Sequence, residues 1–162
     1  MNKMIQRKDI RLKNYNYSQA GYYFVTICTK NRQNLLWNTN VCVCNDSELY
    51  LSPLGFIVDV EINKIAHIYL NVKIDKYVIM PNHIHIIVVL HDESGRSQTV
   101  PTISRIIKQF KGSITKKAGF SVWQKSYYDH IIRNESEYLK ICEYIEFNPL
   151  KWNEDKYYIF ES

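Results

Sequence analysis

Two strand-like segments joined by a tight turn constrain the fold of this chain more than any other feature. Residues 72–80 and 83–90 are both rich in β-branched and aromatic side chains. The dipeptide between them, Pro81-Asn82, is typical of a turn. The sequence therefore predicts a sheet in which these two segments are neighbouring antiparallel strands.

Further strands and helices alternate along the rest of the chain. The segment 21–29 reads GYYFVTICT and predicts a buried strand; residues 123–132 predict another, and a short strand is expected near 41–44. Residues 91–101 are polar and end in proline, as loops do. The resulting order is strand, helix, strand, strand, helix, strand, helix. It favours an α+β fold, a ferredoxin-like antiparallel β-sheet with helices packed on one face.

Two of the expected helices show capping residues and an apolar stripe. Ser52-Pro53 starts the first, which runs to about Tyr69. Thr102 or Ser104 starts the second, and Gly119 ends it. Apolar residues recur at spacings of three and four, which gives each helix one face for packing. These residues are Ile57, Val58, Ile62, Ile65 and Ala66 in the first helix, and Ile103, Ile106, Ile107, Phe110 and Ile114 in the second.

The composition indicates one globular domain. Of the 162 residues, 46% are hydrophobic and 14% aromatic, which permits a real core and excludes intrinsic disorder. No stretch approaches the roughly 18 apolar residues of a membrane span, and the charged start of the chain does not resemble a signal peptide. We expect a single cytoplasmic domain over 1–162, with a basic arm at 1–20, a core at 21–150 and a tail at 151–162.

The sharpest local motif is His83-Ile84-His85. On a strand, residues i and i+2 point to the same face with Cα atoms about 6.5–7 Å apart, so the two imidazoles can share one metal ion. The plain alternative is that two histidines fall on one strand by chance. However, polar side chains on an otherwise apolar strand require partners, which favours metal or anion binding.

The last expected helix carries a second pair of polar side chains. It starts at Asn134, with Glu137 as capping-box partner, and stops at Asn148-Pro149. Tyr144 and Asn148 are four residues apart, so a phenol and an amide project from the same helix face. Each residue alone also has an ordinary explanation, because the chain contains 13 tyrosines and asparagine before proline is a common helix end.

Positive charge is concentrated in two segments. Residues 102–128 contain six basic residues and no acidic one, and the first 13 residues contain five basic residues and one acidic residue. Such segments fit contacts to a phosphate backbone, although a solvated helix face is the plain alternative. The nucleic-acid-binding candidates are Arg7, Lys8, Arg11, Arg105, Lys108, Lys111, Lys116, Lys117 and Lys125.

Three further motifs follow one another along the chain in the order found in a known protein family. They are MPNHIH at 80–85, the stretch 123–134 with its YYDH sequence, and EYIEFNPL at 143–150. Together they closely resemble the REP-associated tyrosine transposases, within the single-tyrosine HUH transposase superfamily (Transposase IS200-like). NYSQ at 16–19, followed by YFVT at 23–26, is also similar to that family, so the resemblance extends over most of the chain.

The resemblance implies metal-dependent cleavage and joining of single-stranded, hairpin-forming repeat DNA through a 5′-phosphotyrosine intermediate. In that scheme His83 and His85 are metal ligands, Tyr144 is the catalytic nucleophile, and Asn148 is a third metal ligand. Mg²⁺ or Mn²⁺ is the implied cofactor, although the ligand types alone also allow Zn²⁺. His130 belongs to a family motif without an assigned role, and a structural use is favoured over metal ligation.

Alternatives to this scheme stay open. A non-catalytic relative would keep the basic face and recognise DNA hairpins. A metal-dependent hydrolase would use the two histidines to activate water, but the remaining residues of the common H-x-H-x-D-H pattern are absent. The oligomeric state is also open: transposases of the wider group often act as homodimers that exchange catalytic helices, whereas REP-associated members can act alone. The expected partner is single-stranded or hairpin DNA and not a membrane, with nucleoid association when DNA is bound.

Overall fold

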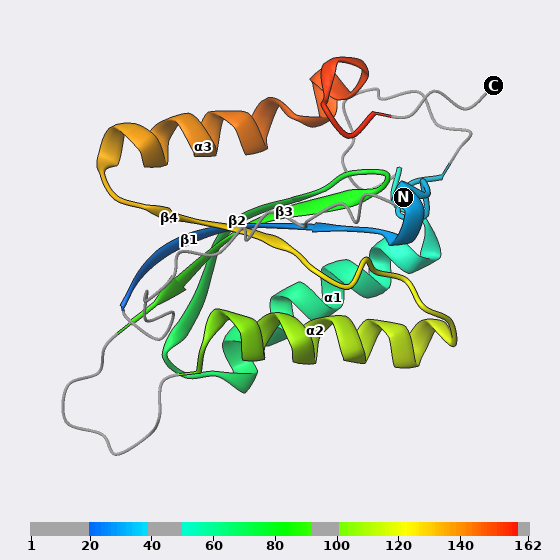
Figure 1. Ribbon diagram of the computed structural model, residues 1–162, viewed down its shortest axis with the longest axis horizontal. Coiled ribbons are helices and arrows are strands. Elements are labelled where there is room, and N and C mark those ends of the chain that lie inside the picture. Colours follow the sequence, from blue (N-terminus) through cyan, green and yellow to red (C-terminus); the bar gives the residue numbers. More distant parts are fainter. Residues whose placement is uncertain (1–19, 39–49, 92–100, 159–162) are drawn as a thin grey trace, which may run out of the picture.

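A four-stranded antiparallel sheet forms the centre of the computed structural model, which describes residues 20–38, 50–91 and 101–158 (Figure 1). The strands are β1 (Gly21–Cys28), β2 (Val72–Ile79), β3 (His83–Leu90) and β4 (Tyr128–Ile132). Their spatial order is β2-β3-β1-β4, and every neighbouring pair is antiparallel. The predicted α+β, ferredoxin-like fold is confirmed. The strand expected near 41–44 lies outside the described residues.

Strand β3 lies inside the sheet, between β2 and β1, and all eight of its residues are buried. Its pairing with β2 across Pro81-Asn82 confirms the antiparallel pair predicted from the sequence. Because successive side chains of a strand alternate between the two faces, His83 and His85 share one face. The opposite face of the strand belongs to the hydrophobic core and presents Ile84, Ile86, Val88 and Leu90.

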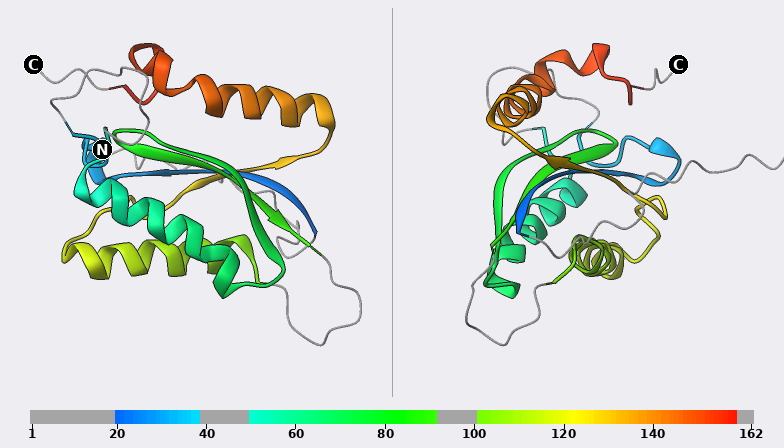
Figure 2. Two further views of the ribbon diagram at one scale, coloured as in Figure 1. Left: turned by 180° about the vertical axis from the view of Figure 1, so that it is seen from behind. Right: turned by 60° about the vertical axis from the view of Figure 1, so that its left-hand side comes forward.

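Helices cover both faces of the sheet. Helices α1 (Pro53–Ile68) and α2 (Ile103–Ala118) pack on one face, and α3 (Glu135–Phe147) lies over the other (Figures 1 and 2). The sequence predicted helices packed on one face; α1 and α2 lie on one face as expected, whereas α3 lies on the other. Two short 3-10 helices, η1 (Lys30–Arg32) and η2 (Pro149–Glu154), complete the elements. In the described ranges, every helix is too short or too polar to cross a membrane.

The helix caps and the apolar residues of α2 lie where the sequence predicts them. The Ser52, Thr102 and Asn134 side chains each accept the backbone N–H three residues later. Gly119 ends α2 with φ of 78°, a left-handed conformation that favours glycine. All five predicted apolar residues of α2 are buried. In α1 the expectation for Ala66 is wrong, since that residue is exposed.

The strand predicted over 123–132 is shorter than expected, because β4 begins only at Tyr128. The half-buried ammonium group of Lys111 explains the difference. It donates hydrogen bonds to the carbonyl oxygens of Gln124, Lys125 and Ser126, so these acceptors bind a side chain in place of a neighbouring strand. Trp123 keeps a single bridge to Thr29 beyond the end of β1.

A buried carboxylate joins the two helices on the core face. Glu61 of α1 is only 6% exposed, and it accepts hydrogen bonds from Ser113 and Lys117 of α2 and from Lys64, at 3.0 Å, of its own helix. Burial by itself raises the pKa of this group, but the hydrogen bonds, led by that of Lys117, lower the pKa of Glu61 to about 2. The carboxylate is therefore ionised in the folded protein at neutral pH.

We predict that Glu61→Gln lowers the free energy of unfolding by about 1–3 kcal/mol at neutral pH, since charge-assisted hydrogen bonds are lost. The pKa is lower in the folded state, so this stabilisation is complete above about pH 4.5 and is lost as the pH falls toward 2. Urea denaturation at several pH values measures the difference. Glu143→Gln, at an exposed glutamate of α3, is the control and should cost less than about 0.5 kcal/mol. If the free energies of unfolding of wild type and Glu61→Gln differed by the same amount at every pH down to 2, Glu61 would not be the ionised, hydrogen-bonded group described above.

Candidate active site

His83 and His85 point from β3 toward the face covered by α3, and their Nε2 atoms are 3.0 Å apart. The neighbouring contacts set the protonation of His83. Its Nδ1 lies 2.8 Å from Oδ1 of Asn82, whose amide group donates to two backbone carbonyls. Because that amide oxygen only accepts, His83 carries its proton on Nδ1 and directs an Nε2 lone pair into the site. Nδ1 of His85 lies 2.8 Å from the Thr26 hydroxyl.

Burial keeps both imidazoles neutral. The two residues are 0% and 1% exposed, respectively. Burial lowers the pKa of His83 to about 4, although the Asp155 charge opposes this shift. Burial and the neighbouring His83 also place the pKa of His85 well below its ordinary value. Neutral imidazole is the form that ligates metal ions.

Helix α3 brings Tyr144 to the histidine pair. The Tyr144 hydroxyl lies 3.2 Å from Nε2 of His85, and its ring meets Phe24 of β1 edge-on at 6.4 Å. Burial and the Asp155 charge raise the pKa of Tyr144 to about 12. The phenol is therefore protonated in this arrangement, and a positive charge near the hydroxyl would be needed to favour the phenolate.

Asn148 lies one turn beyond Tyr144 and is 4% exposed. Its Oδ1 atom is buried without any hydrogen-bond partner in the part of the chain that the structure describes. An orphaned amide oxygen of this kind is costly, unless a ligand completes it. Asn148 lines the same pocket as Tyr144. An amide oxygen and imidazole nitrogens are donor types that suit a divalent cation. The residues present thus fit a metal ion.

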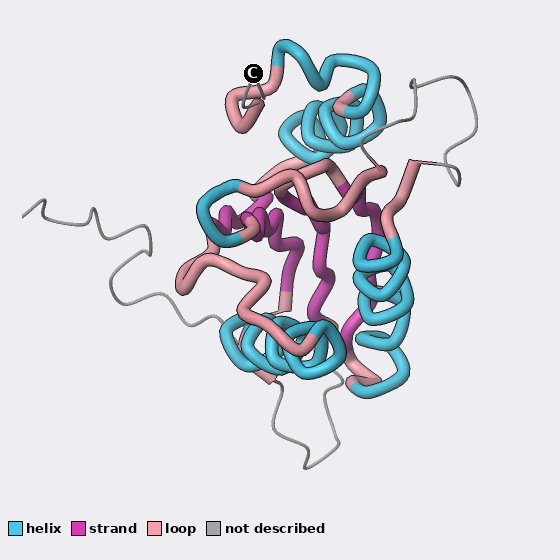
Figure 3. Tube along the Cα trace, turned by 90° about the vertical axis from the view of Figure 1, so that its right-hand side faces the viewer, coloured by secondary structure: helices cyan, strands magenta, loops and turns pink. Residues whose placement is uncertain are grey.

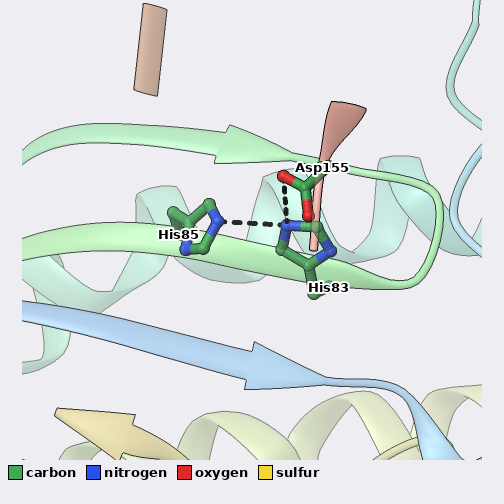
Figure 4. A group of neighbouring side chains, drawn as sticks. All are labelled: His83, His85 and Asp155. Atoms are coloured by element: carbon green, nitrogen blue, oxygen red, sulfur yellow. Dashed lines mark hydrogen bonds and ion pairs between the residues drawn. The ribbon is translucent and has the colours of Figure 1, made fainter. Parts of the chain in front are cut away.

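Asp155 is a member of the site that the sequence reasoning missed. Its Oδ2 atom lies 3.9 Å from Nε2 of His83 (Figure 4). The same atom accepts a hydrogen bond from the Tyr144 hydroxyl at 3.4 Å. One ligand atom from each of His83, His85 and Asp155 lies within 4.8 Å of the others. No motif marked this acid, because it stands in the predicted tail and reaches the histidines only through the fold of η2.

The sequence as a whole places the chain in a known family. Residues 54–148, more than half of the chain, match the family described as Transposase IS200 like. This chain belongs to that family. The matched range includes His83, His85, Tyr144 and Asn148, but it ends before Asp155.

Several relatives of this IS200-like transposase support the assignment. A protein of Haemophilus influenzae without a characterised function is 38% identical over 94% of this chain and 93% of its own length. The REP-associated tyrosine transposase of Escherichia coli is 26% identical over 83% of this chain and 70% of its own. A solved REP-associated tyrosine transposase bound to a REP hairpin has the same fold. Its TM-score is 0.65 at 23% identity, over 90% of this chain and 76% of that one.

His130 lies away from the histidine pair of this IS200-like transposase, on β4. Its Nε2 bonds to Glu137 in the first turn of α3, and the same carboxylate accepts the backbone N–H of Arg133 at 2.8 Å. These contacts fix the start of the helix that carries Tyr144. They support the structural use expected for His130.

The predicted basic residues do not surround Tyr144. Helix α2 lies on the opposite side of the strands from α3 (Figure 3). Lys111 and Lys117 are engaged within the protein, with backbone carbonyls and with Glu61. Lys117 is nevertheless exposed, as are Arg105, Lys108, Lys116 and Lys125. Arg7, Lys8 and Arg11 lie outside the described residues.

We predict that in EDTA the His83 imidazole of the folded protein gains its proton only as the pH falls toward 4. Burial in the sheet disfavours the charged ring, whereas an unfolded histidine titrates near 6.5. NMR titration of the ring signals, assigned by their loss in His83→Gln, measures this pKa. The same protein unfolded in urea is the control. A His83 that titrates near 6.5 in the folded protein would mean that the ring is accessible to water.

Proposed function

We propose that this IS200-like transposase cleaves and rejoins single-stranded DNA, with Tyr144 as nucleophile and with His83, His85 and Asn148 as ligands of a divalent metal ion. One observation carries the proposal: the Tyr144 hydroxyl lies 3.2 Å from Nε2 of His85, which itself lies 3.0 Å from Nε2 of His83. A nucleophile is thus held beside a buried pair of neutral metal-binding groups. Mg²⁺ or Mn²⁺ is the cofactor that the family implies, while the nitrogen and oxygen donors by themselves also allow Zn²⁺.

In the proposed reaction the Tyr144 hydroxyl gives up its proton to solvent, and its oxygen attacks the phosphorus of a DNA phosphodiester. The bond from phosphorus to the 3′ oxygen breaks, and that oxygen leaves with the electron pair and takes up a proton. The products are a 5′-phosphotyrosine and a free 3′ hydroxyl. Attack of a 3′ hydroxyl on the phosphotyrosine reverses the step, so no nucleotide cofactor is consumed. When bound, a divalent cation supplies positive charge that polarises the phosphate and favours the phenolate.

The fold contributes by fixing the position of the nucleophile. Tyr138 of α3 donates a hydrogen bond to Asp75 of β2 at 2.6 Å, and Glu137 bonds to His130 of β4. These contacts fasten the first turns of α3 to two strands, and the helix extends from there to Tyr144. A nucleophile on an anchored helix loses little orientational freedom when substrate binds. Tyr144 reaches His85 of its own chain, so the geometry requires no second subunit; a homodimer stays a prediction.

The choice of DNA as substrate rests on the relatives and on charge. A solved REP-associated tyrosine transposase is bound to a REP hairpin, and the Escherichia coli relative is REP-associated by name. On this chain, a pocket of about 520 Å³ lies between α2 and the segment 121–127, with Lys108, Lys111 and Lys125 among its lining residues. We infer that hairpin-forming DNA contacts this basic side of the molecule.

We predict that Tyr144→Phe abolishes covalent attachment to a labelled single-stranded hairpin DNA and leaves binding within about twofold, since only the nucleophilic oxygen is lost. Denaturing gels of protein and DNA with Mn²⁺ or with EDTA measure the adduct. His83→Ala and His85→Ala should also remove it. Tyr128→Phe, at an exposed tyrosine of β4, is the matched control and should retain full attachment.

Attachment that survives in Tyr144→Phe would move the nucleophile to another tyrosine. Binding without attachment in the wild type would instead indicate a non-catalytic protein that recognises hairpins. Metal-dependent cleavage without an adduct would indicate a hydrolase that activates water at His83 and His85.

A second prediction concerns the basic helix. The double variant Lys108→Gln/Lys116→Gln should weaken hairpin binding and reduce the slope of log K against log salt by roughly 1–2, since each lost phosphate contact removes about 0.7–0.9. Fluorescence anisotropy at several salt concentrations measures the slope. Lys64→Gln, at an exposed position of α1, is the control and should leave the slope unchanged. An unaltered slope in the double variant would place the DNA elsewhere.

A further inference from the structure

Asp155 is a buried carboxylate without a cation to balance it. Its side chain is 2% exposed, and no lysine or arginine among residues 20–38, 50–91 and 101–158 forms an ion pair with it. The histidine beside it, His83, is neutral, because its proton resides on Nδ1 in the bond to Asn82. The contact of 3.9 Å between Asp155 and His83 is therefore not a salt bridge. A buried charge in this condition is costly unless a cation joins it.

The atoms around this carboxylate are those of a metal site. The Nε2 atom of His83 offers a lone pair, and one ligand atom from each of His83, His85 and Asp155 lies within 4.8 Å of the others. Ligand atoms at about 2.0–2.3 Å from one ion lie roughly 3–4.5 Å apart, so this cluster is close to a coordinating arrangement. Asn148, with its unpartnered amide oxygen, lines the same pocket of about 320 Å³ as Asp155.

We infer that Asp155 is an additional ligand of the divalent cation, a carboxylate supplied by the segment after α3 that supplements His83, His85 and Asn148. The inference rests on the proposed function, since it concerns the same cation. The other three donors are neutral and hold a Mg²⁺ or Mn²⁺ ion weakly. An anionic oxygen ligand raises the affinity for these cations and favours them over softer metals.

The fold holds Asp155 in place for this role. Its backbone N–H donates to the carbonyl of Trp152 at the end of η2, at 3.0 Å. Its Oδ1 atom accepts the backbone N–H of Tyr157 at 2.7 Å, which leaves Oδ2 directed toward the histidines. The carbonyl of Tyr157 in turn accepts the Asn82 amide at 2.8 Å. The same asparagine therefore orients both His83 and the segment that carries the carboxylate.

The test is a titration of the full-length protein with Mn²⁺, followed by the EPR signal of free Mn²⁺ and by calorimetry. Asp155→Asn keeps the shape of the side chain and removes its charge, and it should raise the Kd for Mn²⁺ by about tenfold or more. Glu135→Gln, at an exposed acid in the first turn of α3, is the control and should change the Kd by less than about twofold. Mn²⁺ should also raise the melting temperature of the wild type more than that of Asp155→Asn, because binding stabilises the folded state.

Equal Mn²⁺ affinity in the wild type and in Asp155→Asn would overturn the inference, and so would a wild type that binds no Mn²⁺. Should Asp155→Asn unfold in the absence of metal, Asp155→Ser provides the second variant for the same comparison. The proposed function fails separately, through the absence of a Tyr144 adduct in wild-type protein that binds Mn²⁺. His83→Ala, which should lose Mn²⁺ binding under either reading, confirms that the titration reports this site.

Discussion

Strand β3 supplies both the core and the candidate active site, and the registers on its two sides make this possible. Because side chains alternate along a strand, Ile84 and Ile86 enter the core, while His83 and His85 point toward α3. Pairing with β1 places Thr26 opposite His85, at hydrogen-bond distance from its ring. A slip of one residue would turn every one of these side chains to the wrong face. The register of the sheet is therefore the constraint on which the site depends.

Burial then gives the two histidines their chemistry. A ring inside a sheet loses the water that would stabilise its charged form, so His83 and His85 stay neutral and keep lone pairs for a ligand. The same burial demands partners, which Asn82 and Thr26 provide on the Nδ1 side. On the other side the two Nε2 atoms face each other at 3.0 Å, where a single proton at most is shared. Among the described residues, Oδ1 of Asn148, in the pocket beside Tyr144, also has no hydrogen-bond partner.

Local sequence patterns predicted most of the fold, because capping residues, apolar periodicity and turn dipeptides act over a few residues. They failed for 123–127, where the side chain of Lys111 takes the carbonyl groups of a segment distant in sequence. In the site, His83 and His85 lie two residues apart on one strand, so the sequence could place them on the same face. Tyr144 and Asn148 lie four residues apart on the last helix, so the same argument applied to them. Asp155 has no such signal, since only the turn of η2 after Pro149 returns it to the histidines.

In the proposed function, the two faces of the sheet have different roles: one carries the basic helix α2, and the other carries Tyr144. The exposed cations of α2, such as Lys108 and Lys116, lie across the sheet from Tyr144, so one DNA molecule that contacts both must pass around an edge. Strand β4 is one edge, and the segment before it adjoins the pocket beside α2. The pocket beside Tyr144 is lined by three acids and two lysines, namely Glu143, Glu154, Asp155, Lys140 and Lys151. Positive charge is therefore not in excess there, so a DNA strand that enters gains from a cation beside the acids, whereas the α2 side attracts DNA without one.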